Sequence, residues 1–231
     1  VVHLAFMITG TSDRETTRAI NVDGTLNVFR AAAAAGADRF VYASSVAAYG
    51  FHQDNPVPMD ESWPVRPASR LFYAQEKAEL EQLLEEESGQ SHTVEHPFAP
   101  RHVACLARRF TRPSGLDDLA HNYLGVGRAL LQCVLAAGPP GAYNIAADEV
   151  ITADEVAREL GLLAIAFPAG IAQTAARVVA AIPTPAFVPP ATEWVEAASH
   201  PAIMDTTKAK KELGWTPQFT ARETLRATID S

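Results

Sequence analysis

The sequence predicts an α/β fold built on a doubly wound parallel sheet. Short apolar runs at Val1–Phe6 and Arg39–Ser44 have the composition of buried parallel strands. The segments Arg18–Ala35 and Ser69–Glu87 carry apolar residues at helical spacing. Alternating strands and helices favour a parallel sheet with helices on both faces, so we expect ligands to bind where the strands end.

The second half of the chain continues this alternation. An apolar helix is expected over Leu124–Ala137, followed by a strand at Ala142–Ala146. Capping boxes, in which a Thr is followed three residues later by a Glu, predict helix starts at Thr152 and Thr220. Weaker patterns predict a strand over Thr93–Phe98 and a short basic helix over Asp205–Leu213.

Length and composition restrict the class of protein. The 231 residues fit one large domain, or one domain with a small lobe. The net charge of -8 argues against a general nucleic-acid binder, which needs clustered Lys and Arg. Cys105 and Cys133 form no CxxC motif, so we expect reduced thiols in a cytoplasmic protein. Leu162–Ile182 is apolar, but Pro168 interrupts it and Arg177 lies within it. We expect a buried helix here, with a membrane span or anchor as the alternative.

Tyr73 and Lys77 are the first candidates for catalysis. Within a helix they occupy positions i and i+4, so both side chains project from one face. An unperturbed tyrosine has a pKa of about 10, and a neighbouring ammonium lowers this pKa by stabilising the phenolate. Such a tyrosine can take a proton from a carbinol or return it. The alternative is an ordinary helix aromatic beside a surface charge.

Ser45 is the second candidate, because it lies where a predicted strand ends. Its hydroxyl can donate to a substrate oxygen and polarise it. The alternative is a turn serine that bonds its own backbone. Asn21, early in a predicted helix, can bind backbone groups or order a water.

Three histidines in the middle of the chain raise the question of a metal site. His92 and His96 are four residues apart, and His102 follows them. Pro97 and Pro100 prevent a helix that would place these side chains on one face. We therefore expect no bound metal.

Five segments, in this order, resemble the extended short-chain dehydrogenase/reductases, and the last one resembles the sugar-nucleotide epimerase/dehydratase branch. They are Val1–Ala5, Asn21–Val28, Arg39–Gly50, Tyr73–Lys77 and Lys208–Pro217. The resemblance implies a Rossmann-like sheet that here lacks its first strands. It implies a partial dinucleotide-binding domain over residues 1–100. Residues 101–231 would then form a mixed region, which adds to the core and forms a small C-terminal substrate lobe.

The resemblance also implies roles for single residues. Tyr73 would be the catalytic acid/base, and Lys77 would lower its pKa and hold the nicotinamide ribose. Ser45 would hydrogen-bond the substrate, with Asn21 in a supporting role. The cofactor-binding residues that it implies are Leu4, Ala5, Tyr73, Lys77 and Pro97. The implied cofactor is NAD or NADP, with NAD favoured. The implied partners are a small-molecule substrate such as a nucleotide sugar and a second copy of the chain in a homodimer.

The chain departs from the family pattern in three places. The family begins with a strand and a Gly-rich turn that binds the pyrophosphate, and we expect this chain to be N-terminally incomplete because it contains no such turn. Glu95 and His96 stand where the family has an apolar residue and an Arg, and Arg101–Tyr123 matches poorly. We expect an NAD(P)-dependent epimerase, dehydratase or reductase. The alternative is a non-catalytic Rossmann-like fragment unable to bind cofactor.

Overall fold

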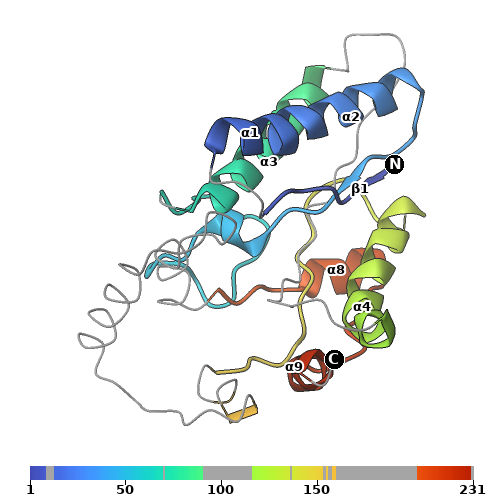
Figure 1. Ribbon diagram of the computed structural model, residues 1–231. Coiled ribbons are helices and arrows are strands. Elements are labelled where there is room, and N and C mark those ends of the chain that lie inside the picture. Colours follow the sequence, from blue (N-terminus) through green and yellow to red (C-terminus); the bar gives the residue numbers. More distant parts are fainter. Residues whose placement is uncertain are drawn as a thin grey trace.

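The computed structural model describes residues 1–8, 13–69, 71–90, 116–135, 137–152, 155, 158–159 and 202–229 (Figure 1). Its elements, in chain order, are β1 (Val2–His3), α1 (Arg14–Arg18), the π-helical segment η1 (Ala19–Asp23), α2 (Gly24–Ala34), β2 (Val41–Tyr42), the 3-10 segment η2 (Val46–Tyr49), α3 (Phe72–Gln90), α4 (Leu116–Val134), α8 (Thr207–Leu213) and α9 (Ala221–Ile229). Helices around a parallel strand pair confirm the predicted α/β class.

The two strands pair in parallel. Val2 lies opposite Val41, and His3 lies opposite Tyr42. Both strands occur where the sequence predicts them, but each is shorter than its apolar run. Because the strands are parallel, the chain leaves both of them at the same edge, which is the edge where a ligand is expected.

Helices cover both faces of this strand pair (Figure 1). Phe40 and Tyr42 face one side, where they pack with buried side chains of α2 and α3. Val41 faces the other side, where it packs with buried side chains of α4 and α8. Successive strand residues point to opposite faces, so β2 contributes to two hydrophobic cores.

The first helical region overlaps the predicted helix Arg18–Ala35, but it begins earlier, at Arg14, and ends at Ala34. Asp13 caps its first turn by accepting the Glu15 N–H at 3.1 Å. Gly36, with a φ of 69°, follows its end, as the sequence predicts. The π-helical segment η1 interrupts the regular α-helix, and segments of this kind are frequent at functional sites.

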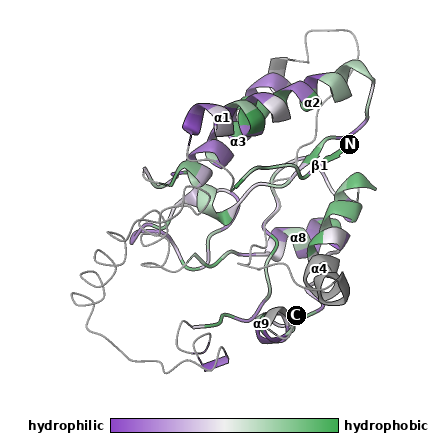
Figure 2. Cartoon of the chain, in the orientation of Figure 1, coloured by the Kyte–Doolittle hydropathy of each residue, from purple (hydrophilic) through white to green (hydrophobic). Residues whose placement is uncertain are grey.

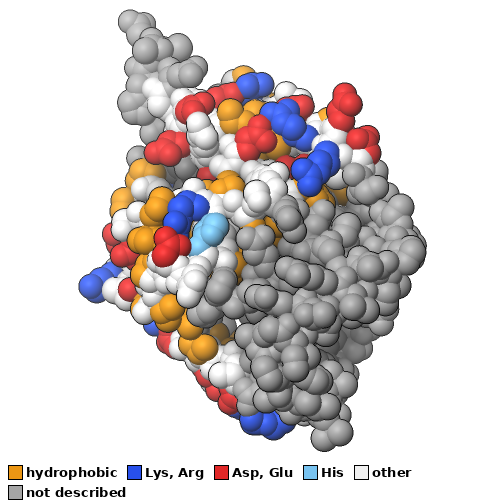
Figure 3. Space-filling model, turned by 90° about the vertical axis from the view of Figure 1, so that its left-hand side faces the viewer, with side chains coloured by type: hydrophobic (Ala, Val, Ile, Leu, Met, Phe, Trp, Pro, Cys, Tyr) orange, Lys and Arg blue, Asp and Glu red, His pale blue; other side chains and the backbone are white. Residues whose placement is uncertain are grey.

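Ion pairs join this helical region to α3 on the outside of the molecule. Arg18 pairs with Glu79, and Arg30 pairs with Glu87. Figure 2 colours α1 mainly as hydrophilic and the segment around β1 mainly as hydrophobic. Figure 3 shows acidic and basic side chains intermingled on one face. Exposed ion pairs contribute roughly 0–1 kcal/mol each, so buried contacts hold α2 and α3 on the strands.

Helices α3 and α4 also begin at other residues than predicted. Helix α3 begins at Phe72 rather than at Ser69. Helix α4 begins at Leu116, well before the predicted Leu124. The polar residues in the first turns of α4 hide the apolar spacing without breaking the helix.

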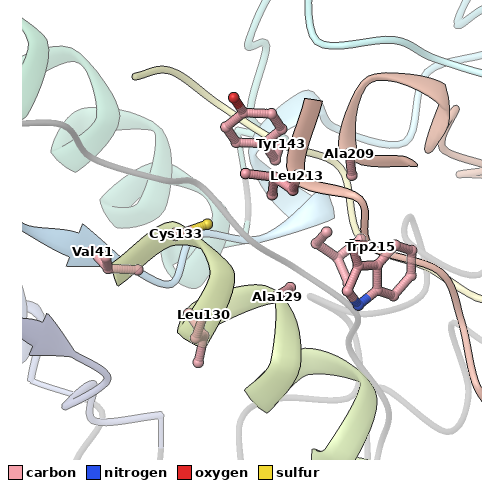
Figure 4. Close-up of a cluster of buried hydrophobic side chains, with 9 residues drawn as sticks. Val41, Ala129, Leu130, Cys133, Tyr143, Ala209, Leu213 and Trp215 are labelled. Atoms are coloured by element: carbon pink, nitrogen blue, oxygen red, sulfur yellow. The ribbon is translucent and has the colours of Figure 1, made fainter. Parts of the chain in front are cut away.

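The second core lies between β2, α4 and α8 (Figure 4). Its buried side chains are Val41, Ala129, Leu130, Cys133, Tyr143, Ile145, Ala209, Leu213 and Trp215. The Trp215 indole N–H donates to the Gly125 carbonyl at 2.7 Å, which fixes the chain after α8 against α4. Cys133 is a free thiol whose pKa is raised by burial to about 11, as expected of a structural cysteine.

The predicted strand at Ala142–Ala146 is wrong. This segment pairs with no strand among the described residues, although Tyr143 and Ile145 are buried as its pattern requires. The Asn144 N–H donates to the Glu61 carboxylate at 2.6 Å. A side chain therefore takes a backbone hydrogen bond that a neighbouring strand would have made.

Both capping boxes are confirmed. The Thr152 and Thr220 N–H groups donate to the carboxylates of Glu155 and Glu223 at 2.9 and 2.8 Å. Helix α8 begins at Thr207, and the chain after it turns at Gly214, whose φ is 63°. In the part of the chain that the structure describes, no helix is long and apolar enough to cross a membrane. Several predictions lie outside the described residues: the strand Thr93–Phe98, the thiol of Cys105 and the buried helix Leu162–Ile182.

Candidate active site

The chain that leaves β2 carries Ser45 into η2. Ser45 has an extended backbone, and its Oγ accepts the Ala47 N–H at 3.1 Å. The turn ends at Gly50, whose φ is 74°. A Cβ added at this position would clash with the Arg66 carbonyl oxygen. Ser45 thus lies at the carboxyl end of a parallel strand, as predicted. The contact with Ala47 is the one expected of a turn serine that bonds its own backbone. Oγ accepts in this contact, so the hydroxyl proton can still be donated to another group.

Tyr73 and Lys77 lie one helical turn apart on the face of α3 that packs against this chain. Their exposed fractions are 3% and 4%. The Lys77 Nζ donates to the Ala43 carbonyl at 2.6 Å, and it lies 5.9 Å from the centroid of the Tyr73 ring. Lys77 is therefore not a surface charge. The structure brings its ammonium to the end of β2, two residues before Ser45.

Aromatic rings surround the Lys77 ammonium. Nζ lies 3.8 Å from the centroid of the Phe6 ring and 4.6 Å from that of Tyr42. Phe6 also meets Tyr73 edge to face, with 5.4 Å between the ring centroids. The negative faces of aromatic rings stabilise a cation. Phe6, which follows β1, thereby joins the strand pair to both candidate catalytic side chains.

Leu4 and Ala5 follow β1 directly, and both side chains are exposed. The exposed fraction of Leu4 is 57%. Two residues later, Phe6 contacts the Lys77 ammonium. An exposed apolar segment beside a buried ammonium suits the nicotinamide end of a dinucleotide, so these residues fit the cofactor that the resemblance implies. Pro97 lies outside the described residues.

Asn21 lies within η1 and is fully buried. Its Nδ2 donates to the Met7 carbonyl at 2.9 Å and to the Glu76 carboxylate at 2.7 Å. Its Oδ1 accepts the Met7 N–H at 2.6 Å. One amide therefore fastens the chain after β1 to α3, between Tyr73 and Lys77 in sequence. Glu76 was not predicted, because its spacing from Asn21 has no pattern in the sequence.

Replacing Asn21 by alanine should lower the free energy of unfolding by about 2–4 kcal/mol. The change leaves the N–H and the carbonyl of Met7 without their buried partner, and each unsatisfied group costs about 1–3 kcal/mol. Urea unfolding measures the effect. Asn27→Ala is the matched control, because Asn27 is exposed on α2. Equal losses in the two variants would contradict this account of Asn21.

Ser44 and Glu81 are two polar residues of this region that were not predicted. The Ser44 hydroxyl donates to the Glu81 carboxylate. Burial raises the pKa of Glu81 to about 7, although the Ser44 hydrogen bond and the charge of Lys77 act in the opposite direction. The signal that could have found Glu81 is its spacing, because positions i, i+4 and i+8 of a helix share a face.

A cavity of about 20 Å³ lies beside these residues, and this volume holds about one water molecule. Ser44, Ser45, Tyr49, Glu81 and Asn144 supply its polar lining. The Tyr49 hydroxyl donates to the Asn144 Oδ1 at 3.1 Å, so residues from both halves of the chain meet here.

The raised pKa of Glu81 predicts how stability depends on pH. The folded protein holds this proton up to about pH 7, whereas an unfolded glutamate releases it near the ordinary 4.5. Its contribution to stability is therefore greatest below pH 4.5 and declines as the pH rises to 7, by at most about 3 kcal/mol. Glu81→Gln removes this titration.

Urea unfolding at pH 5 and pH 8 tests this prediction. The free energy of unfolding of Glu81→Gln, relative to the unchanged protein, should rise by about 1–3 kcal/mol between the two pH values. Glu86→Gln, at an exposed position of the same helix, should show no such rise. A pH-independent difference for Glu81→Gln would refute the assignment.

The histidines weighed as metal ligands, His92, His96 and His102, lie outside the described residues. Within the described ranges, no group of three or more His, Cys, Asp or Glu side chains is arranged to hold a metal ion.

Known proteins resemble this chain over most of its length. A UDP-glucose 4-epimerase of Rhizobium leguminosarum bv. trifolii is 28% identical over 238 residues, which span 91% of this chain and 69% of the relative. The enzyme WbmG of Bordetella bronchiseptica, crystallised with NAD, superposes with a TM-score of 0.62 at 20% identity. A UDP-glucose 4-epimerase of Thermotoga maritima, crystallised with UDP-glucose, superposes with a TM-score of 0.65 at 18% identity.

These two structures share the fold over 99% of this chain and 70% and 75% of their own chains. They support the Rossmann-like α/β class that the sequence implies. The profile of the NAD dependent epimerase/dehydratase family matches residues 1–97, the part that contains Ser45, Tyr73 and Lys77. By this match, residues 1–97 are similar to the NAD dependent epimerase/dehydratase family, and the curated relative extends the similarity to 91% of the chain.

Proposed function

We propose that this protein is an NAD(P)-dependent epimerase or dehydratase, or a reductase of the same type, that acts on a nucleotide sugar. The observation that carries the proposal is the packing of the Tyr73–Lys77 face of α3 against the chain that leads to Ser45. NAD is the favoured dinucleotide, in line with the solved relative that holds it. The nucleotide-sugar class follows the curated relative and the relative that holds UDP-glucose.

Tyr73 is assigned as the acid/base. Its Oη takes the proton of a carbinol hydroxyl when the substrate is oxidised and returns a proton when the carbonyl is reduced. The Lys77 ammonium, 5.9 Å from the ring centroid, stabilises the phenolate through its positive charge. Because Lys77 is held by the Ala43 carbonyl, this charge stays at a fixed place beside the ring.

Ser45 is assigned to the substrate oxygen. Its hydroxyl proton is not consumed by the contact with Ala47, so it can donate to the oxygen that gains negative charge. Asn21 has a supporting role, since it fastens the chain after β1 to α3.

The nicotinamide end of the dinucleotide is assigned to Leu4, Ala5, Tyr73, Lys77 and Pro97. When bound, this cofactor supplies the acceptor and donor of the hydride. The exposed apolar side chains after β1 and the ammonium beside Phe6 favour this position.

Dinucleotide titration and a substrate screen test the proposal. NAD should bind more tightly than NADP, and UDP-sugars or dTDP-glucose should be converted with NAD present. Binding of neither dinucleotide would favour the alternative, a non-catalytic protein with the same fold. If the protein binds a dinucleotide but converts no nucleotide sugar, the cofactor assignment is kept and the proposed substrate class is refuted.

The proposed assembly is a homodimer. The family resemblance implies an interface that includes α3, and the apolar positions of this helix are compatible with such packing but do not require it. Sedimentation equilibrium decides the point, because a single species of 24.8 kDa would exclude the dimer.

A further inference from the structure

We propose that Glu81 is a positioning residue of this active site: through Ser44, it fixes the segment of chain that presents Ser45. The inference rests on the proposed function, because it adds a residue to the same site. Glu81 touches no reacting atom in this account, and it acts only through its neighbour.

The first argument is the repeated contact between one helix face and one stretch of chain. Tyr73, Lys77 and Glu81 occupy successive turns of one face of α3. Lys77 binds the carbonyl of Ala43, and Glu81 binds the hydroxyl of Ser44. Two consecutive residues are thereby held by two consecutive turns. A single contact would leave the chain free to rotate about it, whereas two contacts fix both its position and its direction.

The second argument is that Ser45 comes next in the chain and shares a cavity with Glu81. Ser44 and Ser45 are both buried, and both line the cavity of about 20 Å³ together with Glu81. Above about pH 7, where Glu81 is ionised, its hydrogen bond with Ser44 is charge-assisted and therefore stronger than a neutral one, and burial strengthens it further. Because this bond takes the Ser44 proton, Ser45 is the serine left to donate into the cavity.

The third argument is the charge around Glu81. The charged groups that face it on α3 are Lys77 and Glu85, and the phenols of Tyr42 and Tyr49 face it from β2 and η2. Lys77 is the cation of this group, and it is also the group assigned to the Tyr73 phenolate. Glu81 is therefore placed to fix the position of Ser44 and Ser45 relative to the Lys77 ammonium.

A set of variants tests the proposal by kinetics. Glu81→Ala should lower kcat by about tenfold or more and leave KM within about twofold, since substrate contacts stay in place. Glu81→Gln should keep kcat within about threefold, because the amide oxygen accepts the same Ser44 hydroxyl. Ser44→Ala should resemble Glu81→Ala. The double variant should be no slower than either single one, because both act through one contact.

Glu85→Ala is the matched control, since Glu85 lies on the same helix but is exposed. It should leave kcat unchanged within about twofold. An unchanged kcat in Glu81→Ala would overturn the proposal. So would losses in Glu81→Ala and Ser44→Ala that multiply in the double variant, or a Glu81→Gln variant as slow as Glu81→Ala.

Amide hydrogen exchange separates this proposal from the proposed function, because it needs no turnover. The Ala47 N–H is bound by the Ser45 Oγ, so its exchange rate reports the position of Ser45. This rate should rise by about tenfold in Glu81→Ala and Ser44→Ala and stay unchanged in Glu85→Ala. Equal rates in all variants would overturn the positioning role. A failure of the unchanged protein to convert any nucleotide sugar would instead refute the proposed function.

Discussion

Replacing Tyr73 by phenylalanine should lower kcat by about a thousandfold while dinucleotide binding stays within about twofold. The change removes the hydroxyl and keeps the ring. The ring is the part that packs on Phe6 and fills the cluster around Leu71 and Ala74. The fold and the apolar contacts to the cofactor should therefore survive, and the acid/base should be lost.

Steady-state kinetics and dinucleotide titration of the same preparation measure this separation. Tyr143→Phe is the matched control, because Tyr143 is buried in the other core, where its hydroxyl lies within hydrogen-bond distance of the Pro139 carbonyl and the Glu212 carboxylate. That variant should be less stable but keep its turnover. Normal turnover in Tyr73→Phe would remove this residue from the mechanism.

Replacing Lys77 by methionine should lower kcat by about a hundredfold. Methionine keeps most of the volume but removes the positive charge beside the Tyr73 ring, which the proposed mechanism uses during proton transfer. The variant should also bind dinucleotide more weakly, because Lys77 is the assigned contact to the nicotinamide ribose.

Lys77→Met should in addition destabilise the fold. The Ala43 carbonyl loses its donor, and an unsatisfied buried carbonyl costs about 1–3 kcal/mol. Steady-state kinetics and urea unfolding test the two effects. Lys211→Met, at an exposed position of α8, should change neither. An unchanged kcat in Lys77→Met would contradict the assignment.

The sequence predicts the parts of the site that depend on local spacing. The i, i+4 relation of Tyr73 and Lys77 needs only a helix, and the place of Ser45 needs only the end of a strand. The partners of Asn21 depend on which segments lie side by side, so Met7 and Glu76 have no local signal. The same is true of the contact between Ser44 and Glu81, which joins residues 37 positions apart.

The secondary structure shows the same difference between local patterns and contacts with distant segments. The capping boxes at Thr152 and Thr220 are short-range patterns, and the structure confirms both. Ala142–Ala146 has the composition of a strand, but Glu61 binds the N–H of Asn144. Whether an apolar segment becomes a strand depends on what lies beside it, and this information is not in the segment itself.

The alternation along β2 has a consequence for how the molecule unfolds. Phe40 and Tyr42 belong to one core and Val41 to the other, so neither layer of helices can separate without exposing a part of the same three residues. The two layers should therefore melt as one cooperative unit rather than in turn. Ser45 follows that shared strand by three residues, so its surroundings should persist until the whole core opens. The amides next to it should then exchange hydrogen among the slowest in the chain.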